Sequence, residues 1–417
     1  MRYLILGASA AGLNAAQTIR ELDSGGEITV LSVDREIYSR CLLPGLIDGG
    51  STTREINFIP ENFFELNHIQ WRGGVNVKGL LPEEKAVQAS DGKHHYDRLL
   101  IATGASSTFP PVENLSTCKG VFGLRNLEDA LAINEAAEYS GRAVVLGGGL
   151  VGIEAAEALA RKGLTVTVIE LAGHILPMQL DRKAAVRYEE LLKERGVEVL
   201  TGESVSRVLP AADGRLRAVV LKNGREIPCY FLVVAAGVKP NIDFLKGLPV
   251  DTGRGIKVNG RQETSLPDVY AAGDVCESYE CFTDKVGLTP IWPSAVRQGQ
   301  VAGSNMAGLY KKLEGNFAFK NSMSFCGLAT VSFGLPNPPD EYYTVLVEED
   351  RCNYKKFVLK DGRLAGAILQ GDISGAGVVG SLIGNKLNIT GITKNLFDLT
   401  YADFFCQGQD GSFRYVS

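Results

Sequence analysis

A glycine-rich turn near the start of the chain, followed by an acidic residue, is the first segment suited to chemistry. Its small residues are predicted to contact a bound dinucleotide: Gly7, Ser9, Ala10, Ala11 and Gly12. Gly7 permits a sharp turn, and small side chains let the backbone approach a pyrophosphate, although Ser9 replaces the usual middle glycine. A helix that starts here would offer free N–H groups and a positive dipole end to that anion. Asp34, 22 residues after Gly12, could accept hydrogen bonds from ribose hydroxyls, so the turn predicts a dinucleotide site.

A second turn of the same kind lies in the middle of the chain. The residues predicted to contact a second dinucleotide are Gly147, Gly149, Leu150, Val151 and Gly152. Glu170 follows 18 residues after Gly152, at the end of the next expected strand. A carboxylate there favours the free 2′-hydroxyl of NAD and repels the 2′-phosphate of NADP, and residues 171–173 contain no arginine to bind that phosphate. The second turn therefore predicts NADH in preference to NADPH.

Both turns need the same elements to position them, and the sequence supplies these elements twice. Apolar and helical spacing predicts two strand–helix–strand units, over residues 3–6, 11–22 and 28–33, and over residues 142–146, 151–161 and 165–169. One glycine turn alone is weak evidence, but two complete units with an acid after each are hard to obtain by accident. We therefore predict an α/β fold with two Rossmann-like dinucleotide-binding domains, each of three layers.

Length and composition agree with a globular protein of several domains. The chain has 417 residues, which suggests two to three domains, and 48 glycines, which point to tight turns and close backbone approach. A net charge of −5 argues against a nucleic-acid binder. The sequence has no run of about 20 uncharged apolar residues, so no membrane span is predicted. Eight cysteines scattered through a long chain favour a reduced, cytoplasmic protein.

Four further segments have the sequence patterns of a known family. The residues in them that we expect to contact a cofactor are Ala102, Thr103 and Gly104 (segment 96–104), Gly237 (235–241), Gly273 and Asp274 (269–274), and Pro293 and Ser294 (292–299). With the two turns, these segments resemble the FAD-dependent pyridine-nucleotide oxidoreductases over nearly the whole chain. The resemblance implies FAD at the first turn, NADH at the second, and a ribityl contact for Asp274. It also implies that the helix start at residues 293–294 faces the flavin, where a positive helix end would stabilise the reduced, anionic ring.

The resemblance implies a domain organisation as well. An FAD-binding domain is expected to be split between residues 1–110 and 238–314, with an NAD-binding domain inserted at 111–237. A C-terminal α+β domain, expected to serve as an interface, would fill residues 315–417. The sequence leaves open whether the protein is a monomer or a homodimer.

Cys41 is the first candidate for passing electrons beyond the flavin. It occupies the place of the single redox cysteine in the branch that contains coenzyme A disulfide reductases and NADH oxidases; Pro44 fits that branch, whereas Leu42 replaces its glycine. Arg40, which we also count among the cofactor-binding residues, would favour a thiolate next to it. The competing alignment is to rubredoxin reductases and nitrite reductase flavoproteins, in which a Tyr-x-Arg-Pro-x-Leu pattern holds no cysteine. Cys41 would then be a packed, inert thiol.

Two further residues are catalytic candidates through the resemblance. Tyr401 lies in an Asp-Leu-x-Tyr-Ala segment like that near the end of the dimeric single-cysteine branch, where the tyrosine can reach the partner subunit's active site. The alternative is a buried or interface aromatic, and residues 403–405 depart from the Pro-Pro continuation of that branch. Glu154, one turn into the second helix, can contact the nicotinamide in the family. Equally, it can be a carboxylate that complements the helix dipole.

Several absences narrow the chemistry. The class that reduces glutathione or lipoamide needs Cys-x4-Cys in its first domain and a C-terminal histidine, but the cysteine after Cys41 is Cys118 and all four histidines precede residue 175. Cys276 and Cys281 have that spacing, but they follow Gly273 and Asp274 and do not lie where a flavin-coupled disulfide would be expected. The sequence shows no further metal ligands near this pair, so no metal site is predicted.

We therefore expect an NADH-dependent FAD oxidoreductase that passes hydride from NADH to FAD and then electrons, through Cys41, to a disulfide or persulfide of a small thiol. One alternative is an electron-transfer flavoprotein of the rubredoxin or nitrite reductase type, which would serve an iron–sulfur carrier protein. Others are an NADH oxidase without a redox cysteine and a flavin-binding sensor with little turnover. The physiological acceptor, the oxygen reactivity and the redox state of Cys41 are left open.

Overall fold

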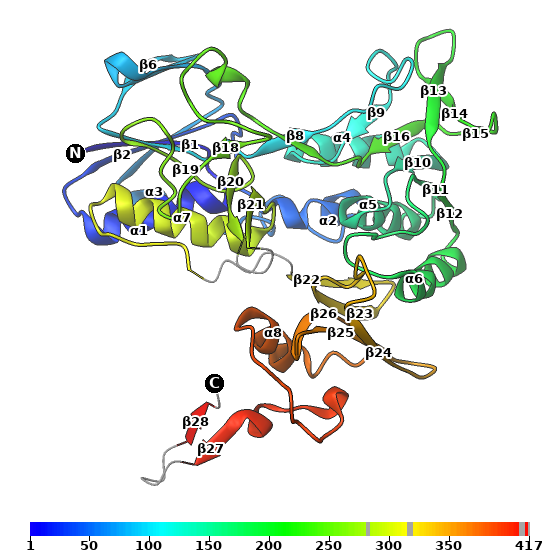
Figure 1. Ribbon diagram of the computed structural model, residues 1–417. Helices are drawn as coiled ribbons and strands as arrows, with labels where there is room; N and C mark the ends of the chain where they lie inside the picture. The colour runs from blue at the N-terminus through cyan, green and yellow to red at the C-terminus, as the bar shows by residue number, and fades with distance from the viewer. Residues whose placement is uncertain (281–283, 315–319, 408–412, 416–417) are drawn as a thin grey trace. The chain divides into compact units, whose positions relative to one another are not determined.

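The computed structural model describes residues 1–417 except 281–283, 315–319, 408–412 and 416–417 (Figure 1). It divides into two compact units. The first comprises residues 1–110, 123–135 and 236–318, and the second comprises residues 111–122, 136–235 and 319–417. The expected inserted domain and the C-terminal segment thus fall largely within one unit.

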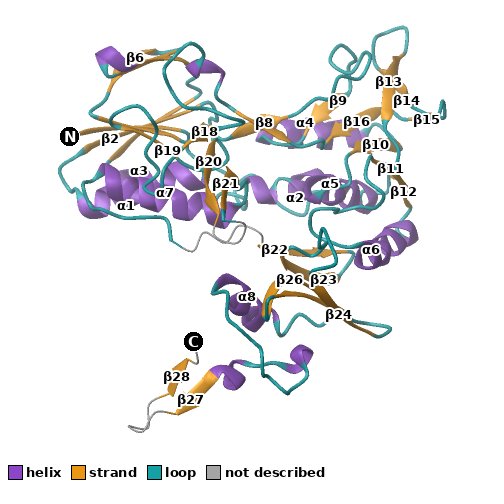
Figure 2. Cartoon of the chain, viewed as in Figure 1, coloured by secondary structure: helices purple, strands orange, loops and turns teal. Residues whose placement is uncertain are grey.

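A five-stranded parallel sheet forms the centre of the first unit (Figure 2). Its strands, in spatial order, are β19 (Val269–Ala271), β7 (Arg98–Ile101), β1 (Arg2–Leu6), β2 (Glu27–Ser32) and β3 (Ile69–Gly73). All four neighbouring pairs are parallel, with Ile5 opposite Val30 and Leu100. The strands that flank the first predicted turn are thereby confirmed.

Two helices cover one face of this sheet, α1 (Ala10–Leu22) and α7 (Trp292–Met306), and they lie side by side (Figure 1). Their close approach depends on glycine, because a Cβ on Gly299 would lie 2.2 Å from the carbonyl oxygen of Ala11. Between helices and sheet lies a core that includes Ile5, Ile19 and Val30. A second core on the other face includes Leu99 and packs against an antiparallel sheet, β4 (Val77–Leu81), β5 (Ala86–Ala89) and β6 (Gly92–His95). The first unit therefore has the three layers predicted from the sequence.

Shorter elements complete the first unit. They are η1 (Arg40–Leu42), α2 (Pro44–Ile47), α3 (Phe63–Leu66), η2 (Pro82–Glu84), the pair β8 (Ala105–Ser107) and β17 (Val238–Pro240), η3 (Asp243–Leu245), and a small sheet of β18 (Ile256–Lys257), β20 (Cys276–Glu280) and β21 (Lys285–Leu288). Helix α4 (Leu127–Glu138) begins in this unit and ends in the second.

The second unit repeats the parallel arrangement. Its sheet order is β12 (Val197–Thr201), β11 (Thr165–Glu170), β10 (Arg142–Leu146), β16 (Phe231–Val234) and β9 (Val121–Gly123), with helices α5 (Leu150–Arg161) and α6 (Arg182–Glu194). The second predicted strand–helix–strand unit is thus confirmed. A three-stranded antiparallel sheet of β13 (Val205–Pro210), β14 (Leu216–Leu221) and β15 (Glu226–Pro228) adds to it.

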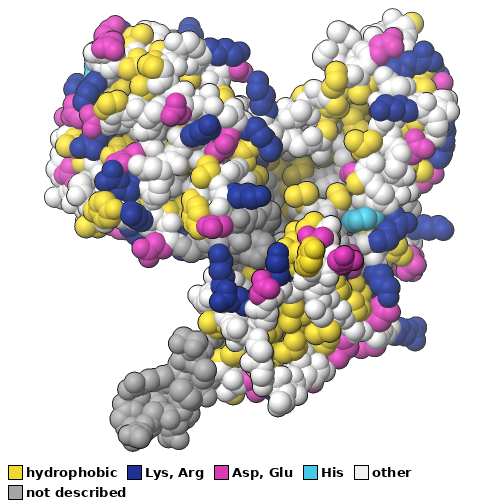
Figure 3. Space-filling model, in the orientation of Figure 1, with side chains coloured by type: hydrophobic (Ala, Val, Ile, Leu, Met, Phe, Trp, Pro, Cys, Tyr) yellow, Lys and Arg dark blue, Asp and Glu magenta, His cyan; other side chains and the backbone are white. Residues whose placement is uncertain are grey.

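The C-terminal part of the second unit is an antiparallel sheet with one helix. The sheet order is β22 (Lys320–Phe325), β23 (Leu328–Gly334), β26 (Arg363–Gln370), β25 (Tyr354–Lys360) and β24 (Thr344–Glu349), followed by α8 (Ala376–Gly384), η4 (Leu396–Asp398), η5 (Tyr401–Phe404), β27 (Phe405–Gln407) and β28 (Phe413–Tyr415). Hydrophobic side chains gather on the face of this sheet region that Figure 3 shows. Val345 and Val347 of the edge strand β24 are more than two-fifths exposed.

Helix α6 is fixed to the C-terminal sheet by a buried polar cluster within the second unit. Asp181 caps α6, because its carboxylate accepts a hydrogen bond from the backbone N–H of Ala184. The same carboxylate accepts hydrogen bonds of 2.6 Å from the Tyr354 hydroxyl and 2.8 Å from the Lys356 ammonium, both on β25. Because three donors converge on one carboxylate, the cluster fixes the register between helix and sheet. Among the residues that the structure describes, no helix is long and apolar enough to cross a membrane.

Candidate dinucleotide and redox site

A cavity of about 600 Å³ lies at the carboxyl ends of the first unit's parallel strands. The residues that follow β1, β2, β7 and β19 all line it, and they include Gly7, Asp34, Thr103 and Asp274. Parallel strands bring their carboxyl ends to one edge of a sheet, which is where open α/β sheets bind ligands. Four segments far apart in the sequence are thereby assembled into one binding site of the size that cofactors need.

The glycine turn at residues 7–12 is shaped for close approach of a ligand. Gly7 has φ +117°, and a Cβ on it would lie 2.1 Å from the carbonyl oxygen of Ala102. A Cβ on Gly12 would lie 1.9 Å from the carbonyl oxygen of Gly7. A larger side chain at either position would displace the backbone beside the start of α1. The turn therefore fits a dinucleotide whose phosphates contact the backbone and the helix N-terminus.

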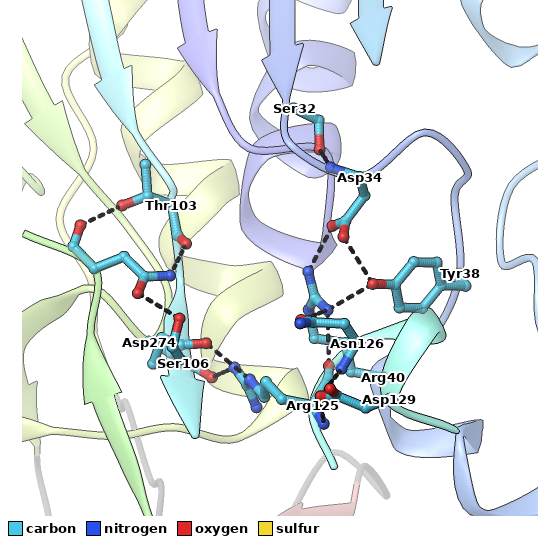
Figure 4. A network of polar contacts seen from close by, with 12 residues as sticks. Ser32, Asp34, Tyr38, Arg40, Thr103, Ser106, Arg125, Asn126, Asp129 and Asp274 are labelled. Carbon is cyan, nitrogen blue, oxygen red and sulfur yellow. Dashed lines mark hydrogen bonds and ion pairs between the residues drawn. The ribbon is translucent and has the colours of Figure 1, made fainter. Parts of the chain in front are cut away.

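Asp34, two residues after β2, belongs to a hydrogen-bonded triad with Tyr38 and Arg40 (Figure 4). Its Oδ1 accepts a bond of 2.8 Å from the Tyr38 hydroxyl, and its Oδ2 accepts one of 2.6 Å from Arg40 Nη2. Burial would lower the pKa of Arg40, but the nearby Asp34 carboxylate and Tyr38 more than offset this, so the pKa is raised. Each carboxylate oxygen can accept a second bond, so the triad orients Asp34 and leaves acceptor capacity for ribose hydroxyls.

Asp274, after β19, is paired with Arg125, which immediately precedes Asn126 and helix α4 (Figure 4). Arg125 Nη2 lies 2.5 Å from Asp274 Oδ2, and Arg125 Nε donates to the carbonyl oxygen of Ala105. The backbone N–H groups of Arg125 and Asn126 donate to Asp129 Oδ2, which fixes this segment at the start of the helix. Arg125 thus brings a positive charge to the cavity, where it can also attract a pyrophosphate.

Asn241, in the predicted segment 235–241, is hydrogen-bonded to residues of and just after the predicted segment 96–104. Thr103 Oγ1 donates to the carbonyl oxygen of Asn241 over 2.9 Å, and Asn241 Nδ2 donates to the carbonyl oxygen of Thr103 over 2.9 Å. Ser106 Oγ donates to Asn241 Oδ1 over 2.7 Å, and β8 pairs with β17 beside it. Hydrogen bonds therefore hold β8 and β17 together at the cavity wall, and Asn241 lines the cavity itself.

Cys41 lies on η1, is exposed, and lines the same cavity as Asp34 and Asp274. The neighbouring Arg40 does not present a bare charge to it, because the guanidinium is bonded to Asp34, Tyr38 and the carbonyl oxygen of Arg125. The structural argument for Cys41 as a redox residue is therefore its position in the cavity wall, not an uncompensated cation beside it.

In the second unit, two backbone N–H groups hold the acid that follows the second glycine turn. Gly147 has φ +113°, and a Cβ on Gly152 would lie 1.9 Å from the carbonyl oxygen of Gly147. Glu170 Oε2 accepts a bond of 2.6 Å from the N–H of Gly148, and Oε1 accepts one of 2.7 Å from the N–H of Ala172. Gly149 precedes α5, which begins at Leu150 and Val151. The carboxylate is thus fixed beside the turn, where it can meet the adenosine ribose of NADH.

Glu154 lies on α5 in the second unit, and burial together with the nearby Glu157 raises its pKa to about 7. A carboxyl group with this pKa can hold or release a proton at neutral pH. Tyr401 is also in the second unit, on η5, and is 46% exposed, so it is not a core aromatic. Its hydroxyl lies 2.9 Å from where a Cβ on Gly377 of α8 would be.

Several other predicted residues of the first unit do not line the cavity. Ser294 is buried and Pro293 is exposed; the neighbours Trp292 and Ala295 line the cavity in their place. Gly237 has φ +99° within segment 235–241. The predicted residues that do line the cavity are Gly7, Ser9, Ala10, Ala11, Asp34, Arg40, Cys41, Ala102, Thr103, Gly104, Gly273 and Asp274.

Of the two cysteines with Cys-x4-Cys spacing, Cys276 and Cys281, the structure describes Cys276. Cys276 is completely buried, and burial raises its pKa far above the ordinary range. Cys281 lies outside the described residues. Within the ranges that the structure describes, no group of three or more His, Cys, Asp or Glu side chains is arranged to hold a metal ion.

Sequence reasoning missed several residues of the cavity. Arg125, Asn126 and Trp292 line the cavity, and Tyr38 orients Asp34. Of the residues that were missed, Tyr38, Trp292 and Asn241 lay in segments that the sequence had singled out. Arg125 lay in none of the segments that the sequence had singled out.

Comparisons with known proteins agree with this geometry. The pyridine nucleotide-disulphide oxidoreductase profile matches residues 1–299, and the rubredoxin NAD+ reductase C-terminal domain profile matches residues 320–387. The epsilon subunit of an NADH-dependent phenylglyoxylate dehydrogenase from Aromatoleum evansii is 34% identical over 93% of both chains.

Two solved structures are similar throughout the chain. A NAD-dependent persulfide reductase from A. fulgidus is 28% identical, with a TM-score of 0.86 over 96% of this chain and 80% of that one. An NADH:rubredoxin oxidoreductase from Clostridium acetobutylicum is 27% identical, with a TM-score of 0.78 over 94% of this chain and 97% of that one.

Proposed function

Because this chain belongs to the pyridine nucleotide-disulphide oxidoreductase family, enzymes that use FAD and NADH, we propose that it reduces a disulfide or persulfide of a small thiol through Cys41. The observation that carries the proposal is the place of Cys41, exposed in the wall of the cavity that holds the first dinucleotide turn. The similarity to a persulfide reductase over nearly the whole chain supports it.

The residues of the chain divide the work of binding the two cofactors. FAD, when bound, supplies the ability to accept a hydride and to pass two electrons onward. Gly7 and the start of α1 would hold its phosphates, Asp34 its ribose, and Asp274 its ribityl chain. Glu170, fixed by the N–H groups of Gly148 and Ala172, would bind the ribose of NADH and disfavour a 2′-phosphate.

Cys41 would act as a nucleophile on sulfur. Its thiolate attacks one sulfur of the acceptor R–S–S–R, the S–S bond breaks, and one thiolate leaves and takes up a proton. The new Cys41–S–R bond is cleaved by two electrons that originate from NADH, which releases the second thiol and restores the Cys41 thiolate. The sum is NADH, one proton and one disulfide giving NAD⁺ and two thiols. A persulfide R–S–S–H gives R–SH and hydrogen sulfide instead.

The exposed Tyr401 and the titratable Glu154 have proposed supporting roles. Glu154, on the helix that begins at the NADH turn, would hold a proton near the nicotinamide. Tyr401 would reach the site of a second subunit, so this role requires a homodimer. Analytical ultracentrifugation tests that requirement directly.

The second candidate function is electron transfer to an iron–sulfur protein such as rubredoxin. Its support is the match of residues 320–387 to the C-terminal domain of rubredoxin reductases. In that case Cys41 would be incidental, and the same holds for an NADH oxidase that does not use a cysteine.

The variant Cys41→Ser separates these functions. We expect it to abolish NADH oxidation driven by coenzyme A disulfide or coenzyme A persulfide, while reduction of an artificial dye by NADH stays intact. Cys352→Ser, which alters another exposed thiol, is the matched control and should change neither rate. If Cys41→Ser kept full persulfide or disulfide reduction, the cysteine mechanism would be wrong. Anaerobic titration gives a second test, since two electron equivalents per flavin indicate flavin alone and four indicate an added cysteine centre.

A further inference from the structure

A cluster of buried amide, hydroxyl and thiol side chains lies behind the Gly273–Asp274 turn and does not line the cavity. Its members are Gln262, Cys276, Ser278, Thr289 and Gln298, of which both glutamines are completely buried. Buried polar groups are costly unless they are hydrogen-bonded. Here they are hydrogen-bonded to one another and to the backbone, so the cluster can hold the segments it connects in place.

Gln298, on α7, bonds to two different segments with its one amide group. Its Oε1 accepts a bond of 2.7 Å from the backbone N–H of Gly273, and its Nε2 donates a bond of 3.1 Å to Thr289 Oγ1. The Cys276 thiol lies 3.5 Å from the same Oε1. Because the donor to Thr289 fixes which way the amide faces, the acceptor is directed at Gly273.

The N–H of Gly273 needs a side-chain acceptor because the parallel sheet no longer supplies a backbone acceptor at this position. The parallel ladder ends at Ala272, whose N–H donates to the carbonyl oxygen of Ile101. Gly273 then takes φ +84°, and a Cβ on it would lie 3.1 Å from the Cβ of Ala11. The next residue is Asp274, which faces the cavity and pairs with Arg125. The N–H of Gly273 is therefore the last backbone donor before the acid.

The other bond of Gln298 leads to a second part of the cavity wall. Thr289 is 6% exposed and immediately precedes Pro290, which lines the cavity, and Trp292 at the start of α7 lines it as well. One buried amide thus connects the turn that presents Asp274 with the segment that begins α7.

We propose that Gln298 is a positioning residue for the bound FAD: it fixes Asp274 and the start of α7 relative to each other without touching the cofactor. Its loss would let the turn and the helix start shift independently. FAD would then bind more weakly, and the environment of the flavin would change. This inference does not depend on which acceptor the enzyme uses.

Titration of the apoprotein with FAD, followed by fluorescence quenching, tests the proposal. We expect Gln298→Met, which keeps the volume and loses the acceptor, to raise the Kd for FAD about tenfold, which corresponds to about 1.4 kcal/mol. The visible spectrum and midpoint potential of the bound flavin should change as well. Gln298→Glu keeps an oxygen acceptor for Gly273 and should recover most of the affinity.

Two further variants keep the test decisive. Thr289→Val removes the partner that orients the amide, and it should weaken FAD binding in the same direction even if Gln298→Met does not fold. Gln300→Met, two residues along the same helix, is the matched control and should leave the Kd unchanged. If Gln298→Met and Thr289→Val lowered only the melting temperature of the apoprotein, with Kd, spectrum and potential as in the parent, the role would be purely structural and the proposal overturned.

Discussion

Arg125 and Asp274, which are 149 positions apart in the sequence, lie with Nη2 and Oδ2 2.5 Å from each other in the wall of the cavity. Their side chains are only 19% and 15% exposed. Because each charge compensates the other in a partly buried place, neither can be removed without leaving its partner uncompensated. The pair also connects the segment before α4 to the acid that follows β19.

Replacing Arg125 should therefore weaken the binding of FAD. We expect Arg125→Met to raise the Kd for FAD by about ten- to hundredfold, since the variant loses a cation of the cavity wall and leaves Asp274 unpaired. Fluorescence titration of the apoprotein measures this. Arg54→Met is the control, because the Arg54–Glu61 pair is about four-fifths exposed and should contribute little. Equal Kd values for the two variants would contradict a role for Arg125 in the site.

The preference for NADH should depend on Glu170. We expect Glu170→Ala to raise the KM for NADH about tenfold, because a charged acceptor for the ribose is lost. Adding Leu171→Arg, at a position 71% exposed, should bring a cation to the 2′-phosphate and make NADPH the better donor. Steady-state kinetics with each nucleotide checks this. Glu198→Ala, at an exposed carboxylate on β12, should change neither KM, and a double variant that still preferred NADH would refute the assignment.

The cluster around Asp181 should contribute strongly to stability. Lys356→Met leaves a buried carboxylate without its cation, since the two side chains are 9% and 14% exposed, and we expect a loss of about 3–5 kcal/mol. Thermal or denaturant unfolding measures it. Lys183→Met breaks an exposed pair between the same helix and β24, and should cost less than about 1 kcal/mol. Losses of similar size for both variants would show that burial of the pair is unimportant.

The same cluster should make the protein sensitive to acid. Burial alone would raise the pKa of Asp181, but hydrogen bonds from Ala184, Lys356 and Tyr354 more than offset this, so the pKa lies below its usual value of 3.8. A depressed pKa gives stability that is present above pH 3.8 and is lost as the pH falls through the folded-state pKa. Asp181→Asn retains a cap for α6 but cannot titrate. Its free energy of unfolding should therefore fall less than the parent's between pH 5 and pH 3, and parallel curves would be evidence against this source of acid sensitivity.

The parts of the site that the sequence revealed are those with local causes. Gly7 and Gly12 carry a signal because only glycine fits between a turn and the carbonyl oxygens of Ala102 and Gly7. Asp34 could be identified because its distance from the turn is set by one helix and one strand. The cap at Asp181 also has a local cause, because its carboxylate accepts a bond from the backbone of Ala184, three residues along the chain.

The parts that the sequence hid depend on contacts between distant segments. Nothing near Arg125 in the sequence indicates that it meets Asp274, because the pairing exists only once β19 and the start of α4 are folded against one cavity. The donors of Arg40 go to Asp34, to Tyr38 and to the carbonyl oxygen of Arg125, which lies 85 positions away in the sequence. The contact between Arg40 and Arg125 exists only in the folded chain, so the sequence could not reveal it.

Glu154 should give the second unit a pH dependence of the opposite sign to that of Asp181. Burial and the nearby Glu157 raise its pKa from 4.5 to about 7, so the native state holds a proton that the unfolded state has already released. Stability from this group is therefore fully present below pH 4.5 and is lost as the pH rises towards 7, by about 2 kcal/mol between pH 5 and pH 8.

The neutral variant Glu154→Gln isolates this effect. It should be more stable than the parent at pH 8 and nearly equal to it at pH 5, because the amide has the shape of the protonated acid and no charge to bury. Denaturant unfolding at the two pH values measures the difference, and ¹³C NMR of the side-chain carboxyl reports the titration directly. Glu190→Gln, at an exposed position on α6, should show no such pH-dependent gain. A Glu154 carboxyl that titrated near 4.5 would rule out a proton held by this residue at neutral pH, and with it the proposed role beside the nicotinamide.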